Sequence, residues 1–117
     1  MDMDMDMMQG EWQVVRIERP GSPGNPDEFV RVRYIFDKDR ATLMDGEQKG
    51  WEGVFRVDPT EEPKTIDFTG TADPHKGEEA FGIYRVEGDA LTICVGKKRP
   101  TQFDGKETIL LELSRIT

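Results

Sequence analysis

The sequence predicts an all-β fold, an eight-stranded antiparallel up-and-down β-barrel with little or no helix. Short runs rich in β-branched and aromatic residues recur along the chain, and clusters of turn-forming residues separate them. No segment combines a hydrophobic period of about 3.6 residues with helix caps. Strands that are apolar on one face need a second layer or closure on themselves, and eight such strands suit a barrel.

The clearest element is a hairpin within residues 80–95. Two strand-like runs flank the tripeptide 87–89, where Gly88 supplies the positive φ that a tight turn needs. In residues 29–37, apolar side chains from Val30 to Phe36 alternate with two arginines, which predicts one buried face. In chain order, the expected strands cover residues 11–18, 29–37, 40–44, 51–57, 65–69, 80–86, 90–95 and 107–115.

The loop lengths predict one closed end and one open end. In an up-and-down barrel, alternate loops lie at the same end. One set of loops is short or stiffened by proline, whereas three of the four loops in the other set are long. We therefore expect a mouth at the end with the long loops, and we expect any function there. The long loops cover residues 19–28, 70–79 and 96–106.

Composition limits the classes of partner. The chain has 117 residues and a net charge of −8, and an acidic surface repels phosphate groups. We therefore expect no nucleic-acid partner. The single cysteine, Cys94, excludes an internal disulfide and fits a reducing compartment.

The two ends of the chain carry the remaining expectations about organisation. Residues 1–8 alternate Met with Asp, which predicts a disordered leader before a single domain over residues 9–117. No apolar run reaches the roughly 20 residues of a membrane span, and the first residues lack the pattern of a secretory signal. We therefore expect no membrane span and a cytoplasmic location.

Two motifs resemble known barrels. Gly10-Glu11-Trp12 matches the Gly-x-Trp signature of lipocalin-type barrels, and Arg115 ends the last expected strand. The resemblance implies that Trp12 plugs the closed end, with Arg115 packed on its ring. Such a cation–π contact contributes about 0.5–2 kcal/mol.

A wider resemblance covers nearly the whole chain after residue 8. The chain looks like a family of uncharacterised lipocalin-like domains abundant in planctomycetes, which implies the fold but no catalytic residues. The segments that carry the resemblance are residues 10–15, 58–60, 63–67, 82–84, 88–91 and 99–100.

Few residues offer catalytic or metal-binding chemistry. With one histidine and one cysteine, a metal site of the usual type lacks ligands, and His75 lies in a turn with Glu78 and Glu79. No basic cluster adjoins Cys94 in the sequence, and the serines lack a nucleophile elbow. The sequence therefore predicts no catalytic residue, no metal and no cofactor, and we do not expect an enzyme.

Two functions stay open. The first is binding of a small apolar or amphipathic molecule at the mouth. In that hypothesis, the basic run would attract an anionic head group, although such a run also serves simply as an exposed charged surface. The second is a protein-interaction module with a packed core and no ligand. The residues of the first hypothesis are Phe29, Trp51, Phe81, Lys97, Lys98 and Arg99.

The expected inward face contains much aromatic volume, which predicts a mostly packed interior with a shallow pocket at the mouth. The inward set is Trp12, Val30, Val32, Tyr34, Phe36, Leu43, Trp51, Phe55, Ile66, Phe68, Tyr84, Leu91, Ile93 and Leu111.

Overall fold

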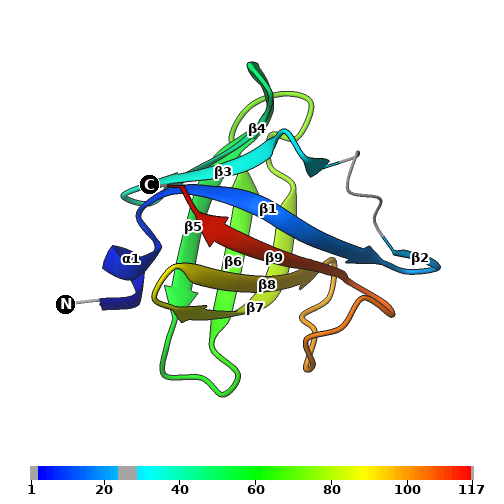
Figure 1. The fold of residues 1–117 in the computed structure, drawn as a ribbon. Helices are drawn as coiled ribbons and strands as arrows, with labels where there is room; N and C mark the ends of the chain where they lie inside the picture. Colours follow the sequence, from blue (N-terminus) through cyan, green and yellow to red (C-terminus); the bar gives the residue numbers. More distant parts are fainter. Residues whose placement is uncertain (1–2, 24–28, 117) are drawn as a thin grey trace.

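The computed structural model describes residues 3–23 and 29–116. Eight antiparallel strands follow one another in chain order around a barrel, and the first pairs with the last to close it (Figure 1). This confirms the predicted all-β, up-and-down barrel. A further two-residue strand, β2, pairs antiparallel with the last two residues of β1. The strands are β1 (Gly10–Arg19), β2 (Ser22–Pro23), β3 (Val32–Asp37), β4 (Arg40–Asp45), β5 (Gln48–Asp58), β6 (Thr65–Gly70), β7 (Glu79–Glu87), β8 (Ala90–Gly96) and β9 (Ile109–Arg115).

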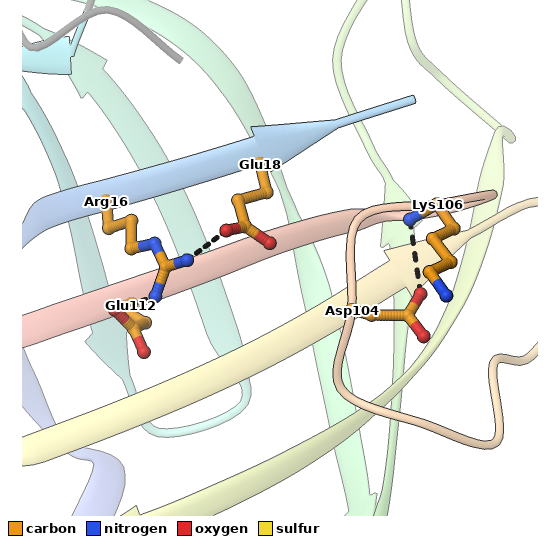
Figure 2. A network of polar contacts seen from close by, with 5 residues as sticks. All are labelled: Arg16, Glu18, Asp104, Lys106 and Glu112. Atoms are coloured by element: carbon orange, nitrogen blue, oxygen red, sulfur yellow. Dashed lines mark hydrogen bonds and ion pairs between the residues drawn. The ribbon is translucent and has the colours of Figure 1, made fainter. Parts of the chain in front are cut away.

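The closing seam between β1 and β9 runs from the pair Trp12–Arg115 to the pair Glu18–Leu110. A bulge between Val14 and Arg16 interrupts its register and leaves Val15 half exposed. Figure 2 shows the outer face of the seam, where Arg16 forms ion pairs with Glu18 of its own strand and with Glu112 of β9. These pairs lie in solvent and contribute little to stability. The backbone ladder and the side chains inside the barrel hold the seam.

Alternation along the strands places the core inside the barrel. In β6, buried and half-buried residues alternate, and Ile66 and Phe68 point inward. Rings from neighbouring strands meet there: Phe36 and Phe55 lie edge to face with centroids 4.9 Å apart. Such pairs add about 0.5–1.5 kcal/mol beyond their area burial.

The strand expected over residues 29–37 begins only at Val32, and Val30 is 63% exposed rather than inward. The β1–β3 ladder ends at Gln13, whose side-chain amide then lies 3.1–3.3 Å from the carbonyls of Phe29, Val30 and Val32. A side chain thus replaces a strand as the partner of this backbone, and the alternation breaks. Phe29 still packs into the core, with 7% of its surface exposed.

Tight turns and a short helix form the closed end of the barrel. The helix α1 (Met3–Met8) replaces the disordered leader expected for this part of the chain. Met8 is fully buried, and Met5 packs against the same core. Residues 1 and 2 lie outside the described residues. Within the described part of the chain, no helix is long and apolar enough to cross a membrane.

The loop between β8 and β9 does not stay at the mouth. It folds over the outer wall, where Ile83, Cys94 and Leu110 form a second small core with Phe103 of the loop. Gly105 makes this approach possible, because a Cβ there would lie 2.8 Å from the carbonyl carbon of Glu18. The turn is held by the Lys106 backbone N–H, which donates to Asp104 Oδ1 over 3.1 Å (Figure 2).

Candidate functional site: a cavity at the mouth of the barrel

A cavity of about 340 Å³ opens inside the barrel at the mouth, the end that carries the β4–β5 and β6–β7 loops. Its walls are inward side chains from β3 to β9, and the β6–β7 loop adds polar groups at the rim. Towards the closed end, the interior is filled by side chains such as Trp12 and Tyr84, which are fully buried. The lining comprises Tyr34, Leu43, Gly50, Trp51, Phe68, His75, Glu78, Glu79, Ala80, Ile93, Val95 and Leu111.

Local backbone features position Trp51 in the wall. A bulge in the β4–β5 ladder follows the pair Leu43–Trp51, so Gly50 is the extra residue. Gly53, the next residue after Trp51 on its face of β5, leaves room for the indole ring. A Cβ on Gly53 would lie 2.5 Å from Trp51 Cη2 and 2.2 Å from the Thr69 carbonyl oxygen. The ring therefore lies across this glycine.

The β6–β7 loop is held as a compact unit above the cavity. The Gly70 N–H donates to the Glu78 carbonyl, and the Gly77 N–H donates to the Gly70 carbonyl, both over 2.9 Å. A Cβ on Gly70 would lie 2.1 Å from the His75 carbonyl oxygen, so only glycine allows the loop to pack so closely. This packing brings His75 and Glu78 to the rim.

Three aromatic rings define the apolar part of the cavity. The rings of Trp51 and Phe68 meet at 84° with centroids 5.9 Å apart, so they form two walls at nearly a right angle. Tyr34 stacks on Phe36 with centroids 5.8 Å apart and an interplanar angle of 6°. Aliphatic side chains such as Ile93 complete the walls. The arrangement offers apolar contact to one ring or one short chain.

The polar groups of the cavity are few and mostly acidic. His75 Nδ1 lies 2.9 Å from Glu78 Oε2 at the rim. Glu79 is on the outward face of β7 with Phe81, at the edge between this opening and the outer hollow of β5 and β6. Burial raises the pKa of Tyr34 to about 12, so its phenol is neutral in ordinary buffers. Within residues 3–23 and 29–116, no group hydrogen-bonds this hydroxyl, so it is available to a ligand.

Of the six residues expected at a ligand site, Trp51 lines the cavity and the others lie elsewhere. Phe29 packs in the core without lining the cavity. Lys97 and Lys98 are exposed on the β8–β9 loop, outside the lining. Phe81 pairs with Asp67 in the β6–β7 ladder, on the face opposite Ala80 and Tyr84, so it points out of the barrel.

Arg99 follows Phe81 to the outer wall. Its Cζ lies 5.6 Å from the Phe81 ring centroid, and its Nη1 donates to the Gly82 carbonyl over 2.9 Å. Arg99 Nη2 and Asp67 Oδ1 are 2.8 Å apart, an ion pair whose angles do not make an aligned hydrogen bond. The basic collar expected around the mouth is therefore not assembled, because Arg99 is fully engaged outside.

The acidic rim was missed by sequence reasoning, which assigned His75, Glu78 and Glu79 to a solvated turn. The signal for this rim was the glycine at each end of the loop, Gly70 and Gly77, which permits the chain to fold back tightly. The orientation of Phe81 could have been read from parity, because residues 81 and 84 lie on opposite faces of one strand.

The residues expected at the closed end lie together there. Arg115 Cζ is 4.3 Å from the Trp12 ring, and Trp12 Nε1 donates to the Met8 carbonyl over 2.9 Å. Arg115 also donates to the carbonyls of Met7 and Gln9, the latter over 2.7 Å. Gly10, at φ +115°, brings the chain from the helix into β1. This end is a structural lock that holds α1 on the barrel.

A second polar contact ties the helix to the barrel. Asp4 Oδ2 accepts hydrogen bonds from the Tyr84 hydroxyl over 2.7 Å and from Lys64 Nζ over 3.0 Å. The bond from Tyr84 is the main cause that lowers the pKa of Asp4. Burial opposes this effect, and Lys64 adds to it.

Other features of the described residues carry less chemistry. Hollows of about 570 and 580 Å³ on the outer face of β5 and β6 are larger, but charged side chains such as Arg56 and Asp67 line both. Cys94 is buried under the β8–β9 loop, 3.0 Å from Thr108 Oγ1. Within the described residues, no group of three or more metal-binding side chains comes together.

Comparisons of the chain with protein-family models, curated proteins and solved structures find no match. The resemblance to lipocalin-like domains is thus supported as far as the closed eight-stranded barrel, and family membership stays a prediction.

Proposed function

We propose that this protein binds a small amphipathic molecule in the mouth cavity. The observation that carries the proposal is a cavity of about 340 Å³ with aromatic and aliphatic walls and a polar rim. Ligand sites in proteins are typically apolar hollows of about 300–1,000 Å³ with a few polar groups that orient the ligand. A molecule with one apolar part and one polar end matches this distribution.

The energetics favour an apolar occupant. Apolar surface removed from water contributes about 25 cal/mol per Å². Trp51 and Tyr34 keep partial exposure at the cavity, so a ligand there would cover surface that folding leaves open. The remaining walls belong to the core, which keeps the cavity in shape without a ligand.

The alternative function, an interaction module with a packed core, has less support. A cavity of about 340 Å³ opens at the mouth, and the β1–β9 ladder occupies the strand edges at which another chain could have paired. A module that binds a protein through its mouth loops remains the alternative, and it needs no small ligand in the cavity.

Isothermal titration of the protein with 1-hexanol tests the proposal. We expect saturable binding, and we expect Ala80→Leu to abolish it because the added carbons enter the cavity that Ala80 lines. Ala90→Leu is the matched control, since it adds the same atoms at an exposed position at the other end of the barrel. Absence of saturable heat with the wild-type protein would overturn the proposal, as would equal binding by Ala80→Leu.

A further inference from the structure

We propose that the mouth cavity selects a small organic cation, an alkyl- or arylammonium ion, over a carboxylate of the same size. This inference rests on the proposed function and names its ligand class. It reverses the charge expected from the sequence, where the basic run at residues 97–99 favoured an anionic head group.

The first argument for a cation is the charge of the side chains that line the cavity. Among the described residues that line the cavity, the charged side chains are Glu78, Glu79 and His75, and none is a lysine or an arginine. Glu78 stands at the rim, and Glu79 lies at its outer edge, where it also lines the outer hollow of β5 and β6. Together the two carboxylates outnumber His75, so the rim keeps a net negative charge even with His75 protonated. An anion entering here would meet like charge, whereas a cation would meet opposite charge.

The second step is the position of the basic side chains near the mouth: in the part of the chain that the structure describes, none of them lines the cavity, and several are paired elsewhere. Arg99 is engaged with Asp67 and the Phe81 ring on the outer wall. Lys49 pairs with Glu52 over 2.7 Å, and Arg33 pairs with Glu11 over 3.1 Å. Lys76, in the β6–β7 loop, is exposed and does not line the cavity.

The third step is the aromatic wall. A cation within about 6 Å of an aromatic ring centre is attracted by the negative face of the ring, and tryptophan is the strongest partner. Tyr34, Trp51 and Phe68 all line the cavity, and the last two stand at 84° to each other. Rings together with nearby carboxylates are the usual means of recognising an organic ammonium ion, because the rings replace part of its hydration.

Glu78 belongs to the acidic rim of the same cavity that the aromatic rings line. Its carboxylate lies 2.9 Å from His75 Nδ1, which restrains it at the rim, while 66% of its side chain stays open to solvent. A ligand can therefore place its apolar part between the rings and its ammonium group near the rim carboxylates. Since these carboxylates are hydrated, we expect a moderate preference, on the order of tenfold over a neutral molecule.

Titration with three probes of one chain length tests this inference: hexyltrimethylammonium, 1-hexanol and hexanoate. We expect the cation to bind about tenfold more tightly than the alcohol, and hexanoate more weakly than the alcohol. The preference should shrink when ionic strength rises from about 0.02 M to about 0.5 M, because salt screens exposed charges.

Two double variants separate local from global attraction. Glu78→Gln with Glu79→Gln should reduce the ratio of cation to alcohol affinity to near one. Glu61→Gln with Glu62→Gln removes the same two charges from an exposed turn at the closed end, and it should keep the ratio. An unchanged ratio in the first variant, or an equal loss in both, would overturn the role of the rim.

The probes also distinguish the proposed function, binding of a small amphipathic molecule, from the proposed preference for a cation. If the alcohol binds but the cation shows no preference over it, or the carboxylate binds best, the ligand class is wrong and the cavity still functions as a binding site. If none of the three probes binds, the proposed function fails, and this inference fails with it.

Discussion

At the scale of single residues, Arg115 connects three segments that are far apart in the sequence. Its guanidinium lies over Trp12, donates to carbonyls at the end of α1, and reaches Asp89 Oδ1 over 3.1 Å. A planar group with five N–H donors can make these contacts simultaneously, and a lysine cannot. The charge of this residue therefore matters less than its shape.

We expect Arg115→Lys to lower the free energy of unfolding by about 1–3 kcal/mol, because the carbonyls of Met7 and Gln9 lose donors and the Trp12 ring loses the planar group on its face. Urea denaturation followed by circular dichroism measures this change. Arg56→Lys is the control: its side chain is 83% exposed and its ion pair with Asp67 is long, at 3.7 Å. We expect this control to stay within about 0.5 kcal/mol of the wild type. Equal losses of unfolding free energy in the two variants would show that the planar guanidinium group of Arg115 has no special role.

Asp4 makes the free energy of unfolding depend on pH. Its pKa in the folded protein is lowered below the ordinary 3.8, first by the bond from Tyr84. The stability from this group is therefore present above the unfolded pKa and is lost as the pH falls through the folded value. We expect Asp4→Asn to be less stable than the wild type at about pH 7, by about 1–2 kcal/mol.

The difference between Asp4→Asn and the wild type should shrink as the pH falls below about 4. Urea denaturation at a series of pH values between about 7 and 2.5 measures it. Tyr84→Phe is a matched variant, because it removes the main cause of the shift and keeps the carboxylate. If the difference in free energy of unfolding between Asp4→Asn and the wild type stays constant across this range, protonation of Asp4 is not coupled to folding.

At the scale of elements, α1 covers the closed end of the barrel. The helix has six residues, too few to be stable alone, so contacts with the barrel hold it, both near in sequence and far from it. The carbonyl of Met8 accepts the Trp12 N–H, and Met8 itself is fully buried. Removing the helix would open the closed end to water.

We expect deletion of residues 1–8 to shift the fluorescence of Trp12 to longer wavelength and to lower the melting temperature, because the indole gains water. The chain contains two tryptophans, so the measurement is made in a Trp51→Phe background, where Trp12 is the single emitter. An unchanged emission maximum in the deletion variant would contradict this covering role of α1.

The β7–β8 hairpin tests turn chemistry at the same scale. Gly88 has φ +57°, and a Cβ there would meet no atom within 4 Å, so any cost of substitution comes from the backbone alone. We expect Gly88→Ala to cost about 1 kcal/mol, and Gly88→Asn to cost less, because asparagine tolerates this conformation. Thermal unfolding of the two variants measures the difference, and equal costs would argue against this reading of the turn.

The strands were predictable from the sequence, and α1 was not. Period-two alternation and turn residues are local signals, and the hairpin around Gly88 shows both. The Met-Asp repeat carries no such signal, because the partners of α1 include Arg115, Lys64 and Tyr84, far away in the chain. A helix stabilised mainly by tertiary contacts leaves little trace in its own residues.

At the scale of the whole molecule, the barrel was predictable, but the polarity of its mouth was not. The prediction placed Arg99 at the mouth because its loop begins there. The loop instead covers the outward apolar face of Ile83, Cys94 and Leu110, and Arg99 pairs with Asp67 on the outer wall. An outward-facing apolar stripe on three neighbouring strands was the signal for this folding-over, and it required the strand register to be seen.

Ligand binding should stabilise the entire barrel, since a small single domain unfolds as one unit. A ligand at about ten times its dissociation constant adds about 1.4 kcal/mol to the free energy of unfolding. We expect hexyltrimethylammonium to raise the melting temperature of the wild type and to leave that of Ala80→Leu in place. An equal rise in both proteins would indicate binding away from the cavity.

The β1–β9 seam has a consequence for how the protein is made. Arg115 bonds a carbonyl 106 positions earlier in the chain, so the first strand of the barrel to be synthesised is also the last to be completed. One edge of β1 finds β3 early, but its other edge waits for residues 110–115 to emerge. Until then the nascent chain is an open, curled sheet with a bare strand edge that neighbouring chains can capture. The yield of folded protein in a cell should then depend on how long that edge is shielded, more than on the final stability of the barrel.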